Sequence, residues 1–266
     1  MSSLTSGPGK AVIGVVHLRP LPGTPFYEPG SLARTVETAI ESARSLDEGG
    51  ADGCLVQTAD RVYSVADEAD PACTAAMAMI VQGITAATRP EFRVGVQIMR
   101  NAAKASIAVA KVADGSFVRV GALVGATLSN HGLVQPNPDD VMSYRQRLDA
   151  WDIGVVADID SMHFSWLGGG KPTADVARAA KLVGADAVCL GSADEARTID
   201  LVRQVHAAVP GLPVILAGHT NHGNVSRLLA EADGAFVGSC LTRGGWDGLV
   251  DVDRVRSYVD AARAVQ

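Results

Sequence analysis

The chain has 266 residues, of which 47% are hydrophobic, and it carries a formal net charge of −6 at pH 7. This balance indicates a globular protein with one large core or two small ones, and without a basic run it offers no electrostatic footprint for nucleic acid, so we expect a small ligand. No stretch is long and apolar enough to span a membrane, and residues 1–10 (MSSLTSGPGK) lack the features of a secretion signal, so we expect a cytoplasmic protein.

Short β-branched runs alternate with segments of helical periodicity along the chain. The strand candidates are residues 11–18, 52–57, 92–99, 116–120, 153–159, 186–191, 212–218 and 233–239. Each run is almost continuously apolar, which is typical of parallel strands covered on both faces. Eight βα units in about 250 residues predict one (β/α)8 TIM-barrel domain over residues 1–266, with residues 1–10 as a flexible N-terminus.

The segments between these strands have features of helices that pack on a sheet. In residues 31–50 the apolar side chains recur at spacings of three and four, Ser31 is a candidate N-cap, and Gly49 and Gly50 end the helix. Three joints from helix to strand share a short acidic turn, in EGGADGCLV, LVGADAVCL and LAEADGAFV. Such turns are typical of the short αβ loops of a barrel.

The cysteines give no covalent or metal framework. They are far apart and form no CxxC pair: Cys54, Cys73, Cys189 and Cys240. This spacing argues against both a zinc ribbon and a set of disulfides. We interpret the four thiols as reduced and mostly buried.

Polar residues follow the first three strands, at the carboxyl ends where the chemistry of such barrels is located. His17 ends the first strand ahead of a proline-stiffened loop, and we favour a pocket role for it over a hydrogen bond to a neighbouring loop. Gln57 ends the second strand, while Gln97, Arg100 and Asn101 end or follow the third. We take Gln57, Arg100 and Asn101 as substrate-binding candidates.

The fourth strand carries Arg119 inside an apolar run. An inward guanidinium there needs a carboxylate or a ligand, and Asp158 is a candidate partner, so Arg119 joins the substrate-binding candidates. The long loop that follows, residues 121–140, is a candidate lid, because loops of this length in a compact domain are usually functional or mobile. It contributes His131 as a further substrate-binding candidate.

The fifth strand ends in VVADIDSMHFSW, which brings Asp158, Asp160 and His163 to the same end of the barrel. Side chains two apart on a strand point the same way, so both aspartates are expected to face inward or both outward. Together with His17 they form a candidate acid/base set. The alternatives are a loop cap with a structural histidine, or a site for a divalent cation.

The loops after the seventh and eighth strands have the composition of an anion site. In AGHTNHGN, Gly218 allows close approach of the backbone, Thr220 offers a hydroxyl, and Asn221 is a candidate cap for the next helix. Gly238 and Ser239 follow the eighth strand. Phosphate is often held by these two loops in TIM barrels, so we favour a phosphate site over a plain helix start.

Several of these segments, in order and spacing, resemble the BtpA family from about residue 12 to the C-terminus: IGVVHLRPLPGTP, GGADGCLVQ, GVQIMRNAAKASIAVA, FVRVGALVGATLSNHGLV, VVADIDSMH and ADGAFVGSCL. The resemblance implies a TIM barrel akin to the phosphate-binding barrels, in a family named for a cyanobacterial factor needed for accumulation of photosystem I. Other members are similar to proteins of sugar operons.

The chain departs from the family pattern at four places. The family usually has Glu-Asn at the position of Gln57-Thr58 and Asp, after Arg-Asn, at the position of Ala102. It usually has Lys at the position of Met162 and Asp-Gln at the position of Asn130-His131. The retained polar residues are His17, Arg100, Asn101, Arg119, Asp158 and His163. The chain thus looks like a diverged member with a retained pocket.

Three functional hypotheses follow. The first is an enzyme that acts on a small phosphorylated metabolite, such as a sugar or ribose phosphate, by acid/base chemistry of an isomerase, a lyase or a glycosidic-bond enzyme. The second is a non-catalytic assembly or scaffold protein of the BtpA type. The third is a divalent-metal hydrolase. No cofactor is required by the pattern, a divalent metal stays open, and homo-oligomerisation stays open as well.

Overall fold

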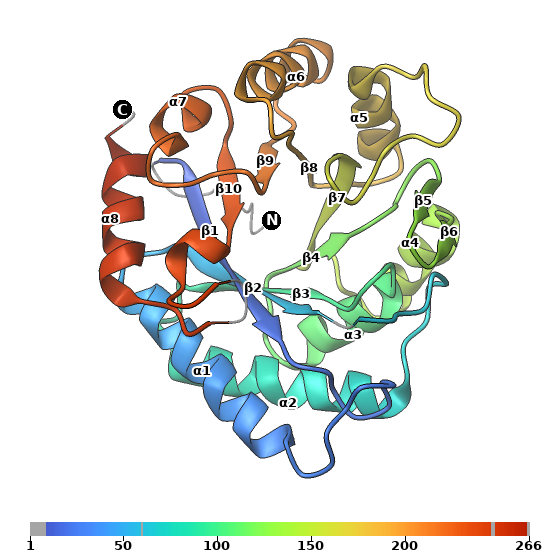
Figure 1. Ribbon diagram of the computed structural model, residues 1–266. Helices are drawn as coiled ribbons and strands as arrows, with labels where there is room; N and C mark the ends of the chain where they lie inside the picture. Colours follow the sequence, from blue (N-terminus) through green and yellow to red (C-terminus); the bar gives the residue numbers. More distant parts are fainter. Residues whose placement is uncertain (1–8, 60, 246–247, 265–266) are drawn as a thin grey trace.

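The computed structural model describes residues 9–59, 61–245 and 248–264, so most of the predicted flexible N-terminus lies outside the described residues. Eight strands belong to the barrel: β1 (Ala11–Leu18), β2 (Gly53–Thr58), β3 (Arg93–Gln97), β4 (Phe117–Val120), β7 (Gly154–Asp160), β8 (Ala187–Leu190), β9 (Val214–Ala217) and β10 (Gly234–Val237). They are parallel and close in the order β1-β10-β9-β8-β7-β4-β3-β2 (Figure 1). The predicted (β/α)8 fold is confirmed, and every predicted strand coincides with one of these barrel strands.

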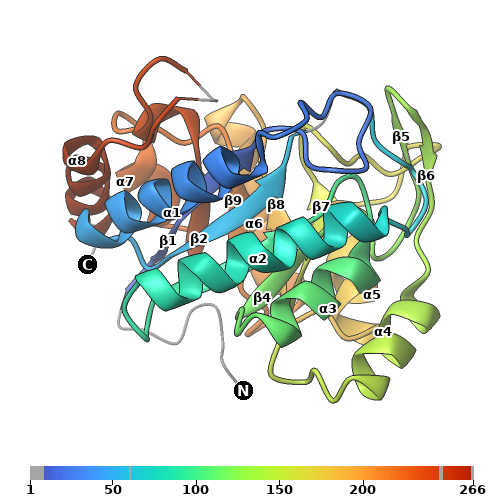
Figure 2. The ribbon, with the colours of Figure 1, turned by 90° about the horizontal axis from the view of Figure 1, so that it is seen from below.

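A helix follows each barrel strand and lies outside the barrel (Figures 1 and 2). The helices are α1 (Leu32–Glu48), α2 (Pro71–Ala87), α3 (Ala103–Val112), α4 (Pro138–Arg147), α5 (Thr173–Leu182), α6 (Glu195–Ala208), α7 (Val225–Leu229) and α8 (Val252–Arg263), and the one-turn 3-10 helix η1 (Ser239–Leu241) precedes α8. None of the helices in the described ranges has the length and apolar character needed to cross a bilayer.

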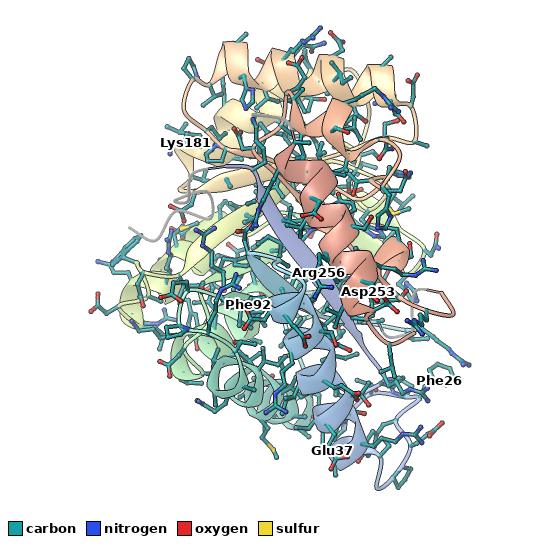
Figure 3. All side chains as sticks on the ribbon, turned by 90° about the vertical axis from the view of Figure 1, so that its left-hand side faces the viewer. Phe26, Glu37, Phe92, Lys181, Asp253 and Arg256 are labelled. Carbon is teal, nitrogen blue, oxygen red and sulfur yellow. The ribbon has the colours of Figure 1, made fainter. Side chains whose placement is uncertain are left out.

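The helix α1 shows how periodicity places a buried face. Ala39, Ala43 and Leu46 are buried against the strands, and the helix ends at Gly49 as predicted. Ser31 occupies the N-cap position, but its side chain makes no capping hydrogen bond. Figure 3 shows α8 beside α1, with the charged side chains of Glu37, Asp253 and Arg256 on the outer surface.

The barrel interior has its own apolar cluster, separate from the layer between strands and helices. Its buried members come from seven of the strands: Ile13, Leu55, Phe117, Val156, Ala187, Cys189, Ile215, Ala217 and Phe236. The rings of Phe117 and Phe236 are stacked with centroids 6.1 Å apart. A Cβ on Gly95 would lie 2.1 Å from the Phe117 ring, so the absence of a side chain at Gly95 makes room for that ring. The lower part of the barrel is therefore filled, as in other TIM barrels.

The three acidic joints noted in the sequence share one structural role. Asp52, Asp186 and Asp233 each accept a hydrogen bond from the backbone N–H of a valine in the preceding barrel strand, at 2.8, 2.9 and 2.8 Å respectively. The backbone N–H of each aspartate also donates to the carbonyl of the same valine, at 2.9 Å in all three cases. Each joint therefore ties one βα unit to the next at the amino ends of the strands. We call these residues the joint aspartates.

The long loop after β4 contains a two-stranded antiparallel hairpin, β5 (Thr127–Ser129) and β6 (Gly132–Val134). The backbone N–H of Ser165, in the loop between β7 and α5, donates to Thr127 Oγ1 at 3.1 Å. The hairpin is thereby attached to the neighbouring loop, and the predicted irregular lid is an ordered element above the carboxyl ends of β4 and β7.

Candidate functional site

A buried ion pair lies in the carboxyl-terminal half of the barrel. Arg119 Nη2 is 2.7 Å from Asp158 Oδ2, and the two side chains are 5% and 1% exposed. The Arg119 guanidinium also lies over the Phe236 ring, 5.3 Å from its centroid. The pairing of Arg119 with Asp158 was predicted from the apolar surroundings of the arginine, and the structure confirms it.

Three polar atoms in this region are buried without a hydrogen-bond partner: Gln97 Oε1, Arg119 Nε and Asp158 Oδ1. They come from β3, β4 and β7, which are consecutive in the barrel. Native proteins pair more than nine in ten buried polar groups, because an unpaired group keeps its full desolvation penalty. Three such atoms on adjacent strands indicate a place prepared for a ligand or an ordered water.

Cys189 joins this cluster from β8, opposite Asp158 in the strand register. Burial and the nearby Asp158 carboxylate raise the pKa of the Cys189 thiol, so the thiol stays protonated near neutral pH. Burial by itself would lower the pKa of Arg119, but the paired Asp158 carboxylate raises it, so the guanidinium stays charged. The sequence analysis treated Cys189 only as a buried cysteine. The clue in the sequence was the position of Cys189 near the carboxyl end of an apolar strand.

His163 lies among positive charges. Burial, together with the charges of Arg100, Arg119, His17 and His219, lowers the pKa of its imidazole to about 4. The imidazole is therefore neutral at pH 7. Its backbone N–H donates to Ser161 Oγ at 3.0 Å, which fixes the turn after β7.

His17 lies beside the eighth barrel strand. A Cβ on Gly238 would be 3.3 Å from His17 Cε1, so the glycine leaves room for the imidazole. His17, from β1, and His163, from β7, therefore belong to one group of side chains around the barrel mouth.

The prediction that Asp158 and Asp160 face the same side is wrong. The register of β7 against β8 shifts between these residues, and such an irregularity breaks the alternation of side chains. Asp160 Oδ2 accepts a hydrogen bond from Thr173 Oγ1 at 2.8 Å and lies 3.4 Å from Arg197 Nη2. Asp160 thus connects β7 to α5 and α6, away from the Arg119–Asp158 pair.

Two substrate-binding candidates are engaged by the protein itself. The amide of Asn101 donates to the Ala122 carbonyl at 3.1 Å and accepts from the Ala122 N–H at 2.8 Å, so it holds the loop after β4. Gln57 is buried, and its Nε2 lies 3.2 Å from Met99 Sδ. These contacts give both residues a structural explanation.

Arg100 and His131 both contact Tyr63, a residue of the loop after β2 that was not among the candidates predicted from the sequence. The Arg100 guanidinium is 4.8 Å from the Tyr63 ring centroid, and the His131 ring is 4.0 Å from it. His131 Nε2 is 2.9 Å from the Arg61 carbonyl, and its Nδ1 is buried without a partner. An aromatic residue in a loop at the active end of the barrel was the clue available for Tyr63.

The loop after β9 turns into α7 through Asn221. Asn221 Oδ1 accepts from the Gly223 N–H at 2.8 Å and its carbonyl accepts from the Val225 N–H at 3.0 Å, while Asn224 stands directly before α7 and its side chain makes no capping hydrogen bond. Thr220 Oγ1 accepts a hydrogen bond from the buried Tyr258 hydroxyl at 2.8 Å. Gly218 has φ +104, and a Cβ there would meet open space. Asn221 therefore caps the turn that leads into α7, and the loop backbone at Gly218 remains accessible.

The loop after β10 turns into η1 at Ser239, and Gly238 is the N-cap of this short helix. Ser239 is exposed at the mouth of the barrel. Tyr258, which comes from α8, anchors the β9 loop beside it. The sequence analysis had not linked α8 with this loop.

The predicted metal ligands do not converge. Among the residues that the structure describes, no three His, Cys, Asp or Glu side chains are grouped so that they can hold a metal ion. Asp160 contacts Thr173 at the start of α5, whereas one carboxylate oxygen of Asp158 accepts a hydrogen bond from Arg119. The described residues therefore give no geometric support to the alternative of a metal site at Asp158, Asp160 and His163.

Two cavities open at the carboxyl end of the barrel. One of about 260 Å³ lies between the β5–β6 hairpin and the loop after β7, and its lining includes Arg100 and His163. A second of about 370 Å³ lies beneath the loops after β1 and β2, and its lining includes Tyr63 and Cys73. Neither lining includes Gln97, Arg119 or Asp158.

The closed parallel barrel with a polar carboxyl end defines the chain as a TIM-barrel protein. The chain belongs to the BtpA family, whose model matches residues 8–264. An uncharacterized protein of Archaeoglobus fulgidus is 33% identical, over 96% of this chain and 99% of the relative. The photosystem I biogenesis protein BtpA of Synechocystis is 30% identical, over 94% of this chain and 87% of the relative.

Solved structures share the fold. The thiamine phosphate pyrophosphorylase of Pyrococcus furiosus has a TM-score of 0.60 and 16% identity, with 96% of each chain covered. The orotidine 5'-phosphate decarboxylase of Pyrococcus horikoshii has a TM-score of 0.58 and 12% identity, over 94% of this chain and 99% of the other. At this identity the likeness shows the fold alone.

Proposed function

We propose that the protein is an enzyme that binds a small phosphorylated metabolite at the carboxyl end of the barrel and acts on it by acid/base chemistry. The observation that carries this proposal is the set of buried, unpartnered polar atoms on Gln97, Arg119 and Asp158. A barrel that served only as a scaffold would be more stable with apolar residues here, since replacing a buried ion pair by packed hydrophobic residues is often neutral or stabilising.

The proton-transfer roles go to Asp158, His163 and His17. Asp158 is oriented by Arg119 through one oxygen, which leaves its second oxygen for the ligand. His163 is neutral at pH 7 because its pKa is lowered to about 4, so one ring nitrogen can accept a proton and the other ring N–H can donate a hydrogen bond. His17 faces the same mouth from β1. Asp160 is left out because its carboxylate contacts Thr173 and Arg197.

The phosphate is proposed to bind between the loops after β9 and β10. Gly218 has open space beside its backbone, Gly238 adjoins the His17 imidazole, and Thr220 and Ser239 add hydroxyl groups. These are the two loops that hold phosphate in many TIM barrels. Two enzymes that share the fold, the thiamine phosphate pyrophosphorylase and the orotidine 5'-phosphate decarboxylase, are named for phosphorylated compounds. Positive groups at the mouth, Arg100 and Arg119, favour an anionic ligand.

The proposed reaction class is isomerisation, carbon–carbon lyase chemistry or glycosidic-bond chemistry. All three need a proton to be moved at a held substrate, which the proposed Asp158, His163 and His17 set supplies. An aldolase mechanism through a Schiff base is disfavoured, because Lys104 and Lys111 lie in α3 and Lys171 lies over the Trp166 ring in the loop after β7. Cytoplasmic location and homo-oligomerisation remain predictions.

The rival is a non-catalytic assembly protein, since one relative is named for photosystem I biogenesis. A thermal-shift screen with sugar phosphates, nucleotides and inorganic phosphate separates the two, because a ligand at about 100 times its Kd stabilises by about 2.7 kcal/mol. We expect a selective rise of Tm with one class of phosphorylated compound, lost in Ser239→Tyr, which fills the proposed phosphate position. A flat response across the panel contradicts the enzyme and favours the assembly role.

Repeating the screen with a chelator tests the hydrolase hypothesis. We expect no change of Tm or of ligand response on adding chelator. Turnover of the compound found in the screen should then be lost in His163→Phe with the Tm response to the compound retained. Retained turnover in that variant contradicts the proton-transfer role of His163.

A further inference from the structure

Three arginines are buried in the described part of the chain, and they differ in what compensates their charge. Arg119 pairs with Asp158, and Arg145 pairs with Asp186 and donates to several backbone carbonyls. Arg100 is 7% exposed and forms no ion pair among the described residues. Its Nε is buried without a hydrogen-bond partner, and its Nη2 donates to the Tyr63 hydroxyl at a long 3.3 Å.

A buried guanidinium without a counter-ion is unfavourable, because burial removes its hydration and nothing replaces it. The Tyr63 ring, 4.8 Å from the guanidinium, gives a cation–π contact that compensates only part of this loss. The planar fork of an arginine matches the two oxygens of a carboxylate or phosphate. Arg100 therefore has the chemistry of an anion receptor whose anion comes from outside the chain.

The cavity of about 260 Å³ next to Arg100 supplies the space for that anion. Its other walls are polar: Thr127 and Asn130 from the hairpin, and Ser161 and Ser165 from the loop after β7. Thr127 Oγ1 and Ser161 Oγ each accept a backbone N–H, at 3.1 and 3.0 Å, so each hydroxyl proton is available to donate. His163, neutral at pH 7, also lines the cavity.

We propose that this cavity binds an oxyanion of the substrate, a carboxylate or a second phosphate, through Arg100. The inference rests on the proposed function and names the substrate class. Around the barrel, β9 is four strands from β3 in either direction, so Arg100 after β3 lies across the mouth from the loop after β9. The substrate is then anionic at both ends, with one anion at the β9 and β10 loops and the other at Arg100.

The test is isothermal titration calorimetry of the full chain with two matched probes, phosphoglycerate and glycerol phosphate. Both carry one phosphate, but only the first has a carboxylate. We expect phosphoglycerate to bind at least about tenfold more tightly than glycerol phosphate, because a hydrogen bond to a charged group contributes that much to the binding free energy. In Arg100→Gln the two probes should bind equally, with the affinity for glycerol phosphate unchanged. Propanediol bisphosphate tells a second phosphate from a carboxylate by binding more tightly than phosphoglycerate.

The control is Arg61→Gln, which removes an exposed arginine from the same group of loops. It should leave all affinities unchanged. If Arg100→Gln fails to fold, Arg100→Lys keeps the charge without the fork and should lose most of the preference for phosphoglycerate. Equal binding of the two probes to the unmodified chain, or an equal loss in both variants at positions 61 and 100, overturns the inference.

The two proposals fail in different ways. Malonate, which has carboxylates and no phosphate, should bind to the unmodified chain and not to Arg100→Gln. If malonate behaves so while both monophosphates fail to bind, the Arg100 site stands and the phosphate site is wrong. If glycerol phosphate binds and malonate does not, the phosphate site stands and the Arg100 inference is overturned.

Discussion

At Asp158, one carboxylate oxygen contacts the buried guanidinium of Arg119 and the other has no partner. Substituting Asp158→Asn leaves Arg119 as an uncompensated buried charge. We expect the free energy of unfolding to fall by about 3 to 5 kcal/mol, as is found on removing one member of a buried pair. Chemical denaturation measures this. Asp160→Asn should lose about 1 kcal/mol, because Asp160 is partly exposed and contacts exposed Arg197.

A double variant tells structure from function at this pair. Arg119→Met with Asp158→Leu replaces both charges by apolar groups, which should return most of the stability lost in Asp158→Asn. The same variant should bind no phosphorylated ligand if the pair serves the site. Restored stability together with unchanged ligand binding would contradict the proposed role of Asp158.

His163 should titrate far below an ordinary histidine. Its pKa is about 4 in the folded chain against an ordinary value of 6.5 for a histidine. Between these values the unfolded chain binds the proton more strongly, so the contribution of His163 to stability is complete above pH 6.5 and is lost as pH falls towards 4. NMR of the imidazole should show one neutral form down to about pH 5. Arg100→Gln removes a positive neighbour and should raise the pKa of His163, whereas Arg61→Gln should not.

At the level of single residues, the sequence predicted only part of the candidate site. Arg119 could be paired with Asp158 from sequence because a charge in an apolar strand must be compensated. The sequence could not predict that Arg100 forms no ion pair among the described residues, because such contacts are known only once the chain is folded. Tyr63 was missed because it lies in a loop of irregular sequence.

Among the elements, the β5–β6 hairpin depends on a glycine at its base. Gly125 has φ +70, and a Cβ there would lie 2.3 Å from Trp166 Cζ3 in the loop after β7. Gly125→Ala should therefore lower the free energy of unfolding by about 2 to 4 kcal/mol, through both backbone strain and the clash. Gly168→Ala is the control, because Gly168 has φ +88 with open space around it and should cost about 1 to 2 kcal/mol. Equal losses would show that Trp166 moves aside easily.

Strands and helices were predicted well because their apolar periodicity depends on local sequence. The register shift between Asp158 and Asp160 was not, since it arises from the pairing of β7 with β8. Asn221 and Asn224 both have side chains suited to capping, and both lie at the start of α7: Asn224 stands directly before the helix, while Asn221 Oδ1 accepts the Gly223 N–H in the turn that leads into it.

For the whole molecule, the alternation of eight apolar runs with helical segments was sufficient to predict the barrel, because parallel strands buried on both faces leave few other architectures. Membership of the BtpA family agrees with this fold. The chemistry could not be predicted in the same way. A barrel of this kind accommodates many reactions through its loops, and those loops are the least regular parts of the sequence.

The joint aspartates should affect global stability without affecting the site. In Asp186→Ala the Val155 N–H and buried Arg145 lose an acceptor, and we expect the free energy of unfolding to fall by about 2 to 3 kcal/mol. The Kd for any ligand of the barrel mouth should stay within about twofold. The substitution lies at the amino ends of the strands, whereas the loops that form the mouth follow the carboxyl ends. A large change of Kd in this variant would show that the two ends are coupled.

The joint aspartates also bear on how the family can diversify. Asp52, Asp186 and Asp233 join consecutive units at the amino ends of the strands with contacts that do not involve the loops at the opposite end. A loop at the mouth can therefore be lengthened, shortened or recharged while the frame beneath it stays closed. Selection on ligand choice and selection on folding then act on separate sets of residues, so relatives with this frame are free to differ in what they bind.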